Sequence, residues 1–169
     1  MPVSRYLATI LVGTIASTAL LTTSASAAPA TGAAAASATS MQKAVVQLTN
    51  AARRKAGCPA LKIKPALHKA AQRHSADMAK HNYVGHIGSH GSTIVDRVEA
   101  SGYTGWSALA ENVAAVHVTA AGVVKSWMNS PGHRANILTC SLEHIGVGYV
   151  KQAGSAHGTY WTQNFGAKF

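Results

Sequence analysis

The stretch WMNSPGHRANIL, residues 127–138, sets a Ser-Pro-Gly-His tetrapeptide between an apolar helical segment and a second short apolar run. Ser130 suits the N-cap of a new helix, and Pro131 suits its first position. His133 then falls at the third position, where the partial positive charge of the helix N-terminus disfavours the imidazolium form. A neutral imidazole can accept a hydrogen bond, bind a metal or remove a proton. The alternative is that the tetrapeptide only separates two helices and that His133 is incidental.

Other helices are expected on both sides of this stretch. Apolar residues recur every three or four positions over residues 41–56, which predicts a first helix. Pro65 suits the first turn of a second helix, whose apolar face includes His74. We interpret His74 as a hydrogen-bonded core residue and assign it no function. A short helix over 94–101 and another over 119–128 complete the helical pattern.

Strand-like segments gather in the second half of the chain. The run LAENVAAVHV, residues 109–118, is followed much later by IGVGYV at 145–150 and YWTQNF at 160–165. The segment 151–159 between the last two is rich in Gly, Ser and His, as an exposed hairpin loop is. Because helices come first and strands last, we expect an α+β domain with helices packed on a mainly antiparallel sheet.

The N-terminus has the features of a secretory signal peptide. Arg5 precedes an apolar run over residues 6–21, and Ala25-Ser26-Ala27 offers an A-x-A cleavage site. We therefore predict a signal peptide over residues 1–27, a flexible Ala/Ser/Thr-rich spacer over 28–40 and one domain over 41–169. No later segment is apolar for long enough to cross a bilayer, so we expect a secreted, extracellular protein.

The charge is strongly basic and unevenly distributed. The chain has 15 Lys and Arg against 5 acids, and nine of the basic residues lie between Lys43 and Lys80. Outside a cell, such a basic surface attracts anionic envelope polymers or lipid head groups, which makes association with the cell wall one hypothesis. A solvated face that only keeps the protein soluble is the alternative. Nucleic acid is not an expected partner, because no recognised binding motif is present and export removes the usual target.

Two cysteines occur, Cys58 and Cys140, and they lie 82 positions apart. In an exported chain an even pair favours a disulfide over a redox couple or half of a zinc site. Closing so long a loop stabilises a fold by about 4 kcal/mol in the chain-entropy model. Two free buried thiols are the alternative.

Five segments together carry a family resemblance: GHIGSHGSTIVDRV, GYTGWSALAENVA, VVKSWMNSPGHRANIL, IGVGY and YWTQNFG. In this order and at these spacings they resemble the CAP superfamily of cysteine-rich secretory, antigen 5 and pathogenesis-related proteins, also called the SCP-like extracellular domain. The resemblance covers residues 41–169 and is to the bacterial secreted type. It implies a three-layer α-β-α sandwich. It also implies a central cleft that, in many members, two histidines and two glutamates line and can use to hold a divalent metal.

Only half of that ligand set is present in the expected places. His86 matches the first histidine of the family pattern and Glu111 the first glutamate. Ser130 stands where many members have the second glutamate, and Tyr160 stands where they have the second histidine. The Ser-Pro-Gly-His segment makes His133 the substitute. We therefore expect His86, Glu111, Ser130 and His133 to line the cleft, with His86 and His133 as candidate ligands for Zn²⁺ or another divalent metal.

Glu111 lies among apolar residues, where an inward carboxylate needs a partner to offset its lost hydration. His86 or His133 could be that partner, and the contact could equally be structural. Two classes of function follow. The favoured one is a monomeric binding or envelope-associated module for an anionic polymer or a lipid-like ligand. The alternative is a metal-assisted extracellular hydrolase with Glu111 as general base, so enzymatic activity stays open.

Overall fold

The computed structural model describes Met1 and residues 30–169. Apart from Met1, the predicted signal peptide and its cleavage site lie outside the described residues. Among the described residues, no helix combines the length and the apolar character that crossing a bilayer requires.

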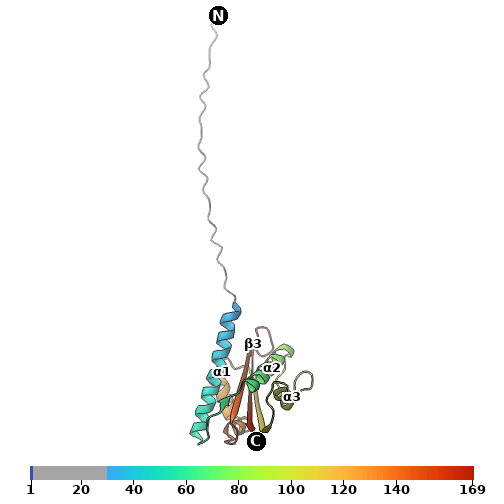
Figure 1. The fold of residues 1–169 in the computed structure, drawn as a ribbon. Coiled ribbons are helices and arrows are strands. Elements are labelled where there is room, and N and C mark those ends of the chain that lie inside the picture. The colour runs from blue at the N-terminus through green and yellow to red at the C-terminus, as the bar shows by residue number, and fades with distance from the viewer. Residues whose placement is uncertain (2–29) are drawn as a thin grey trace.

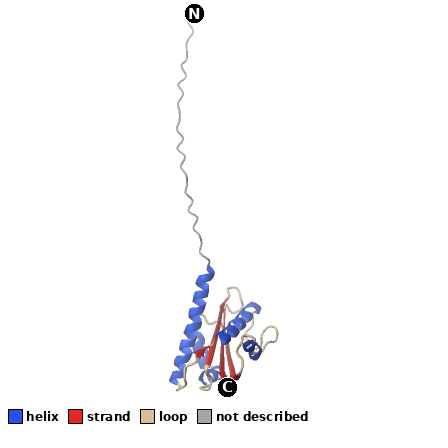
Figure 2. Ribbon diagram, in the orientation of Figure 1, coloured by secondary structure: helices blue, strands red, loops and turns tan. Residues whose placement is uncertain are grey.

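Within the described residues, five helices and four strands form three layers (Figures 1 and 2). One face of the sheet is covered by α1, α4 and α5, and the other by α2 and α3. This arrangement confirms the α+β prediction and the α-β-α sandwich that the family resemblance implies. The elements are α1 (Ala30–Lys55), β1 (Lys62–Ile63), α2 (Pro65–His81), α3 (Ile94–Glu99), β2 (Trp106–Ala115), α4 (Ala120–Asn129), α5 (Pro131–Leu138), β3 (His144–Lys151) and β4 (Thr159–Lys168).

The central sheet has the strand order β1-β3-β4-β2. Strand β4 pairs antiparallel with β3, as the hairpin pattern in the C-terminal sequence predicts, and also pairs antiparallel with β2. Strand β1 was not predicted from the sequence. It contributes two residues, which pair parallel with His144 and Ile145 of β3. The sheet is therefore mainly antiparallel, and β2, which carries Glu111, forms one of its edges.

Helix α1 begins at Ala30, eleven residues before the start that the sequence predicts at residue 41. Residues 30–40 are helical, whereas we predicted a flexible spacer over 28–40. The physical reason is composition, because alanine has the highest intrinsic helix propensity and this stretch is mostly alanine. Ala38 and Met41 also pack against the core, which supports the helix from the sheet side. The division into spacer and domain is otherwise untested and stays a prediction.

The buried face of α1 is rotated from the stripe that spacing alone suggests. Val45, Thr49 and Arg53 are fully buried, whereas Leu48 is 37% exposed. Thr49 and Arg53 tolerate burial because both are hydrogen-bonded. Part of the apolar stripe on α1 is therefore not used in the core and remains available at the surface.

Helix α2 packs closely on β3 because β3 has glycine at two facing positions. A Cβ added to Gly146 would collide with the backbone of Leu67 and His68, and one added to Gly148 would collide with the backbone of Ala71. Backbone atoms cannot rotate away as a side chain can. The alternation of glycines in IGVGY thus sets the distance between α2 and the sheet.

The end of α1 is fixed to the segment after α5 in two ways. Cys58 and Cys140 form the predicted disulfide. Beside it, the buried guanidinium of Arg53 donates hydrogen bonds to the backbone carbonyls of Pro59, Ile137, Thr139, Cys140 and Leu142. Among residues 30–169, no carboxylate is a partner of this cation, so backbone dipoles compensate its burial. Burial accordingly lowers the pKa of Arg53.

Candidate functional site

His86 and Glu111 contact each other although they lie 25 positions apart in the chain. Nδ1 of His86 is 2.9 Å from Oε1 of Glu111. The glutamate lies in the middle of β2 with its side chain only 3% exposed, whereas the histidine side chain is 56% exposed. The carboxylate therefore holds Nδ1 as the protonated nitrogen, and the other ring nitrogen, Nε2, is free to meet a ligand.

The second carboxylate oxygen of Glu111 is also engaged. Arg97 of α3 approaches Oε2 at 2.8 Å, and its side chain is only 9% exposed. The side-chain amide of Asn164 on β4 lies beside the same oxygen. In the orientation that satisfies its neighbours, its nitrogen donates to Oε2 at 3.0 Å and its oxygen accepts from Ala71 N–H at 3.3 Å. The Glu111 side chain thus has a partner on each oxygen.

His133 lies at the third position of α5, as predicted, and approaches the same region of β2. Its carbonyl accepts a hydrogen bond from Nδ2 of Asn112, the residue after Glu111. Burial, and secondly the positive charge of nearby His86, lowers the pKa of His133. His133 thus lies beside the edge strand β2, on the side of the sheet that α5 covers. We call His86, Glu111, Arg97 and His133 the His-Glu cluster.

Ser130 occupies the predicted N-cap position of α5, but its side chain makes no capping hydrogen bond. Its backbone N–H instead donates to the carbonyl of Trp127 at the end of α4. Among the described residues, no hydrogen bond joins the Ser130 side chain to the His-Glu cluster. The prediction that Ser130 lines a functional cleft is untested and stays a prediction, as do the functional roles of the other three residues.

The segment that presents His86 is held on α2 by Asp77. The Asp77 carboxylate accepts hydrogen bonds from the backbone and side chain of Ser89 and from the Tyr83 hydroxyl. Burial raises the pKa of Asp77, but these hydrogen bonds and that of His81 outweigh it and hold the pKa well below its usual range. The carboxylate therefore stays ionised near neutral pH. Its hydrogen bonds to Ser89 and Tyr83, which hold the segment that carries His86, persist there.

His74 is buried on α2, as the core interpretation expects. Its Nε2 lies 2.8 Å from the carbonyl of Gly85, to which it donates, so Nδ1 is the unprotonated nitrogen. Burial is the main cause of the lowered pKa of His74. The residue is thus a neutral histidine that fixes the backbone next to His86.

The residues present do not fit the metal site that the family resemblance implies. Within the part of the chain that the structure describes, no three His, Cys, Asp or Glu side chains are grouped so that they could hold a metal ion. Both oxygens of Glu111 already have partners. Tyr160, in the place of the second histidine, is fully buried and packs with Met78 and Val113. We therefore derive no chemistry from a metal at this site.

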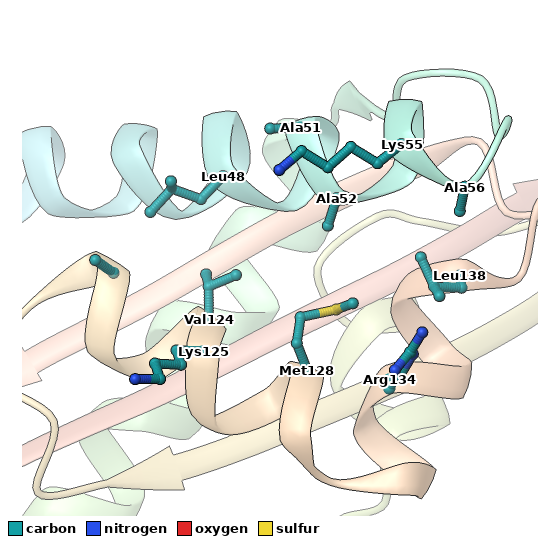
Figure 3. A pocket seen from close by; sticks show the side chains of 11 residues that line it. Leu48, Ala51, Ala52, Lys55, Ala56, Val124, Lys125, Met128, Arg134 and Leu138 are labelled. Carbon is teal, nitrogen blue, oxygen red and sulfur yellow. The ribbon is translucent and has the colours of Figure 1, made fainter.

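A groove of about 570 Å³ lies elsewhere, between α1, α4 and α5. Figure 3 shows Leu48 and Ala52 of α1 facing Val124 and Met128 of α4 across it. None of the His-Glu cluster lines this groove. Three cationic side chains do, one from each helix, and no acid does: Lys55, Lys125 and Arg134.

Comparison with known proteins identifies the family. The model of the cysteine-rich secretory protein (CAP) family matches residues 46–165. The chain belongs to this family. A protein of Bacillus subtilis (strain 168), described as uncharacterized protein YkwD, is 41% identical over 127 residues, which cover 75% of this chain and 47% of that protein. The chain thus spans about half the length of this curated relative.

Solved structures agree on the CAP fold. An extracellular SCP-domain protein of Bacillus anthracis superimposes with a TM-score of 0.73 at 28% identity, covering 85% of this chain and 45% of that one. An outer surface protein of Borrelia burgdorferi superimposes with a TM-score of 0.69 at 21% identity, covering 77% and 94% of the two chains. The second likeness shows the fold alone.

Sequence reasoning missed two features of the site. Arg97 was not singled out, although the rule that a buried carboxylate needs a partner applies to it as well as to the histidines. The groove was also missed. The available indication was Leu48 and Ala52, which extend the apolar stripe of α1 beyond the width that one packed face uses.

Proposed function

We propose that this CAP protein is an extracellular binding protein whose groove between α1, α4 and α5 takes an anionic amphiphile: one alkyl chain with a phosphate or carboxylate head. The observation that carries the proposal is the combination of apolar walls with three cations and no acid in one groove. Export is inferred from the predicted signal peptide, the disulfide, and the extracellular SCP-domain protein that the chain resembles.

The walls suit an alkyl chain. Leu48, Val124, Met128 and Leu138 supply apolar surface. Alanines on α1 and α4 keep the space between the helices open. The volume lies within the range of small-molecule sites, about 300–1,000 Å³. Apolar area removed from water stabilises a complex by roughly 25 cal/mol per Å², so an alkyl chain laid in the groove gains affinity from these walls.

The cations suit the head group. Lys55 is the last residue of α1, Lys125 belongs to α4 and Arg134 belongs to α5, and all three line the groove. Lysine and arginine lay their apolar stems along a groove while the charged ends remain in water. With no acid in the lining to compensate them, these three groups favour an anion over a neutral head group.

Dodecyl phosphate, titrated calorimetrically below its micelle concentration, is the direct test. We expect saturable binding that is at least about tenfold tighter than that of the neutral alcohol dodecanol. Replacing Lys125 and Arg134 together by glutamine should remove this preference for the anion. Ala121→Phe, which fills the groove, should weaken both ligands.

The matched control is Lys69→Gln combined with Arg73→Gln on α2, which removes the same charge from the opposite face of the sheet. This variant should bind dodecyl phosphate as the wild type does. Equal affinity for the phosphate and the alcohol, or equal loss in both double variants, would refute the role of the groove cations.

A second candidate function, attachment to an anionic envelope polymer, is favoured by one feature of α2. Lys69, Arg73 and Lys80 are exposed and lie four and seven positions apart, on one stripe of the helix. Asp77, the acid nearest to them in sequence, contributes one negative charge, so the stripe keeps an excess of positive charge. A row of cations with this excess along one helix fits a linear polyanion.

Cosedimentation with purified cell walls checks this second candidate. The wild type should pellet at low salt and be released as the salt concentration rises, because exposed charges are screened. Reversing Lys69, Arg73 and Lys80 to glutamate should abolish pelleting, whereas glutamine at Lys125 and Arg134 should leave it unchanged. Pelleting that does not respond to salt would exclude electrostatic attachment.

The metal-assisted hydrolase gains no support from the geometry. A general base must be free to take a proton from water or substrate. Glu111 is 3% exposed and has partners on both oxygens. We therefore favour binding over hydrolysis.

A further inference from the structure

We propose that Arg97 is the resident cation of the His-Glu cluster: it takes the electrostatic place of a divalent metal beside Glu111, and the cluster keeps its geometry without a metal and does not bind one. This inference is independent of the proposed function, because none of the four residues of the His-Glu cluster is among those that line the groove.

The Glu111 carboxylate already has three partners, which use three of its roughly four lone-pair sites. Its Oε2 receives Arg97 at 2.8 Å and the Asn164 amide at 3.0 Å, and its Oε1 receives His86 at 2.9 Å. The carboxylate is 3% exposed, so solvent does not compete for it. A metal ion that binds both oxygens would therefore have to displace Arg97 or the Asn164 amide from Oε2.

Displacing Arg97 is costly because a second hydrogen bond fixes its guanidinium. The same group donates to the backbone carbonyl of Ser92 at 2.7 Å, which ties α3 to the segment carrying His86. With the side chain only 9% exposed, a displaced guanidinium would remain buried beside a metal of the same charge sign. Breaking a buried ion pair by removing one partner is strongly destabilising, and the ion pair resists a competing cation for the same reason.

The histidines cannot compensate for the loss of the carboxylate. His86 uses Nδ1 to donate to Glu111, which leaves one ring nitrogen, and His133 contributes one more imidazole. Two imidazoles alone fall short of the three protein ligands that zinc sites use as a minimum. The fixed positive charge of Arg97 nearby further disfavours a dication. What the two histidines can still meet is a neutral or anionic group.

Zinc titration of the purified protein, followed by the imidazole C–H signals in NMR, tests the proposal residue by residue. Nine histidines are present, so resolved signals are needed to separate this cluster from surface binding. We expect the His86 and His133 signals of the wild type to stay unchanged at equimolar zinc. Saturable shifts of both signals in the wild type would overturn the proposal.

Two variants at position 97 identify the cause of the exclusion. Arg97→Met frees Oε2 of Glu111, and we expect zinc affinity at His86 and His133 to rise by about tenfold or more. Arg97→Lys keeps the cation and should bind zinc no better than the wild type. A folded Arg97→Met protein without zinc binding would contradict the role of Arg97. Where that variant does not fold, the wild-type titration still decides whether the cluster takes a metal.

Discussion

Replacing Arg53 by methionine is expected to lower the free energy of unfolding by about 4 kcal/mol. The side chain is fully buried, and its guanidinium donates to five backbone carbonyls: those of Pro59 after α1, of Ile137 in α5, and of Thr139, Cys140 and Leu142 after α5. Methionine fills much of the volume but donates nothing, so the buried carbonyls of Ile137 and Leu142 lose their partner without gaining water. Urea unfolding followed by tryptophan fluorescence measures the loss.

The neighbouring residue provides the control. Arg54 carries the same side chain on the exposed side of α1, and Arg54→Met should change the unfolding free energy by less than about 0.5 kcal/mol. The disulfide beside Arg53 remains intact in both variants. Similar losses for Arg53→Met and Arg54→Met would mean that charge, and not the carbonyl cluster, determines the effect.

Gly148→Ala is expected to destabilise the fold by about 3 kcal/mol. The added methyl group would collide with the backbone of Ala71 on α2, so the helix must move away from β3. Moving α2 also disturbs the amide of Asn164, which accepts from Ala71 N–H and donates to Glu111. The same urea experiment gives the stability change, and the NMR signal of His86 reports on the cluster.

Gly132→Ala is the matched control, because nothing lies within 4 Å of a Cβ at that position and its backbone is helical. It should be neutral or slightly stabilising, since alanine favours a helix over glycine. A Gly148→Ala protein as stable as the wild type would show that α2 does not need the close approach to the sheet.

Much of the secondary structure was predictable because it follows from local chemistry. The start of α2 at Pro65 and of α5 at Pro131 follows from the fixed φ of proline, and the hairpin from alternation. The start of α1 was mispredicted because we took low complexity as flexibility, although alanine favours helix. Strand β1 was missed because two residues carry no period, and only their pairing with β3 defines them.

The site was predictable only in part, for a different reason. Glu111 was expected to need a partner, and the contact with His86 agrees with that argument. The partner on the other oxygen, Arg97, is one basic residue among 15, and no local pattern distinguishes it. The same holds for Arg53 against Arg54, because the rotation of about 100° between adjacent helix residues decides which one is buried. The groove depends on the spacing of three helices, which no single segment encodes.

The most direct test of the binding proposal is NMR of the protein with ¹³C-labelled methionine methyl groups, titrated with dodecyl phosphate. Met128 lines the groove, whereas Met78 is fully buried on α2 across the sheet. We predict a saturable shift of the Met128 methyl signal with no change at Met78. A Met128 signal that stays fixed while dodecyl phosphate binds elsewhere would contradict it.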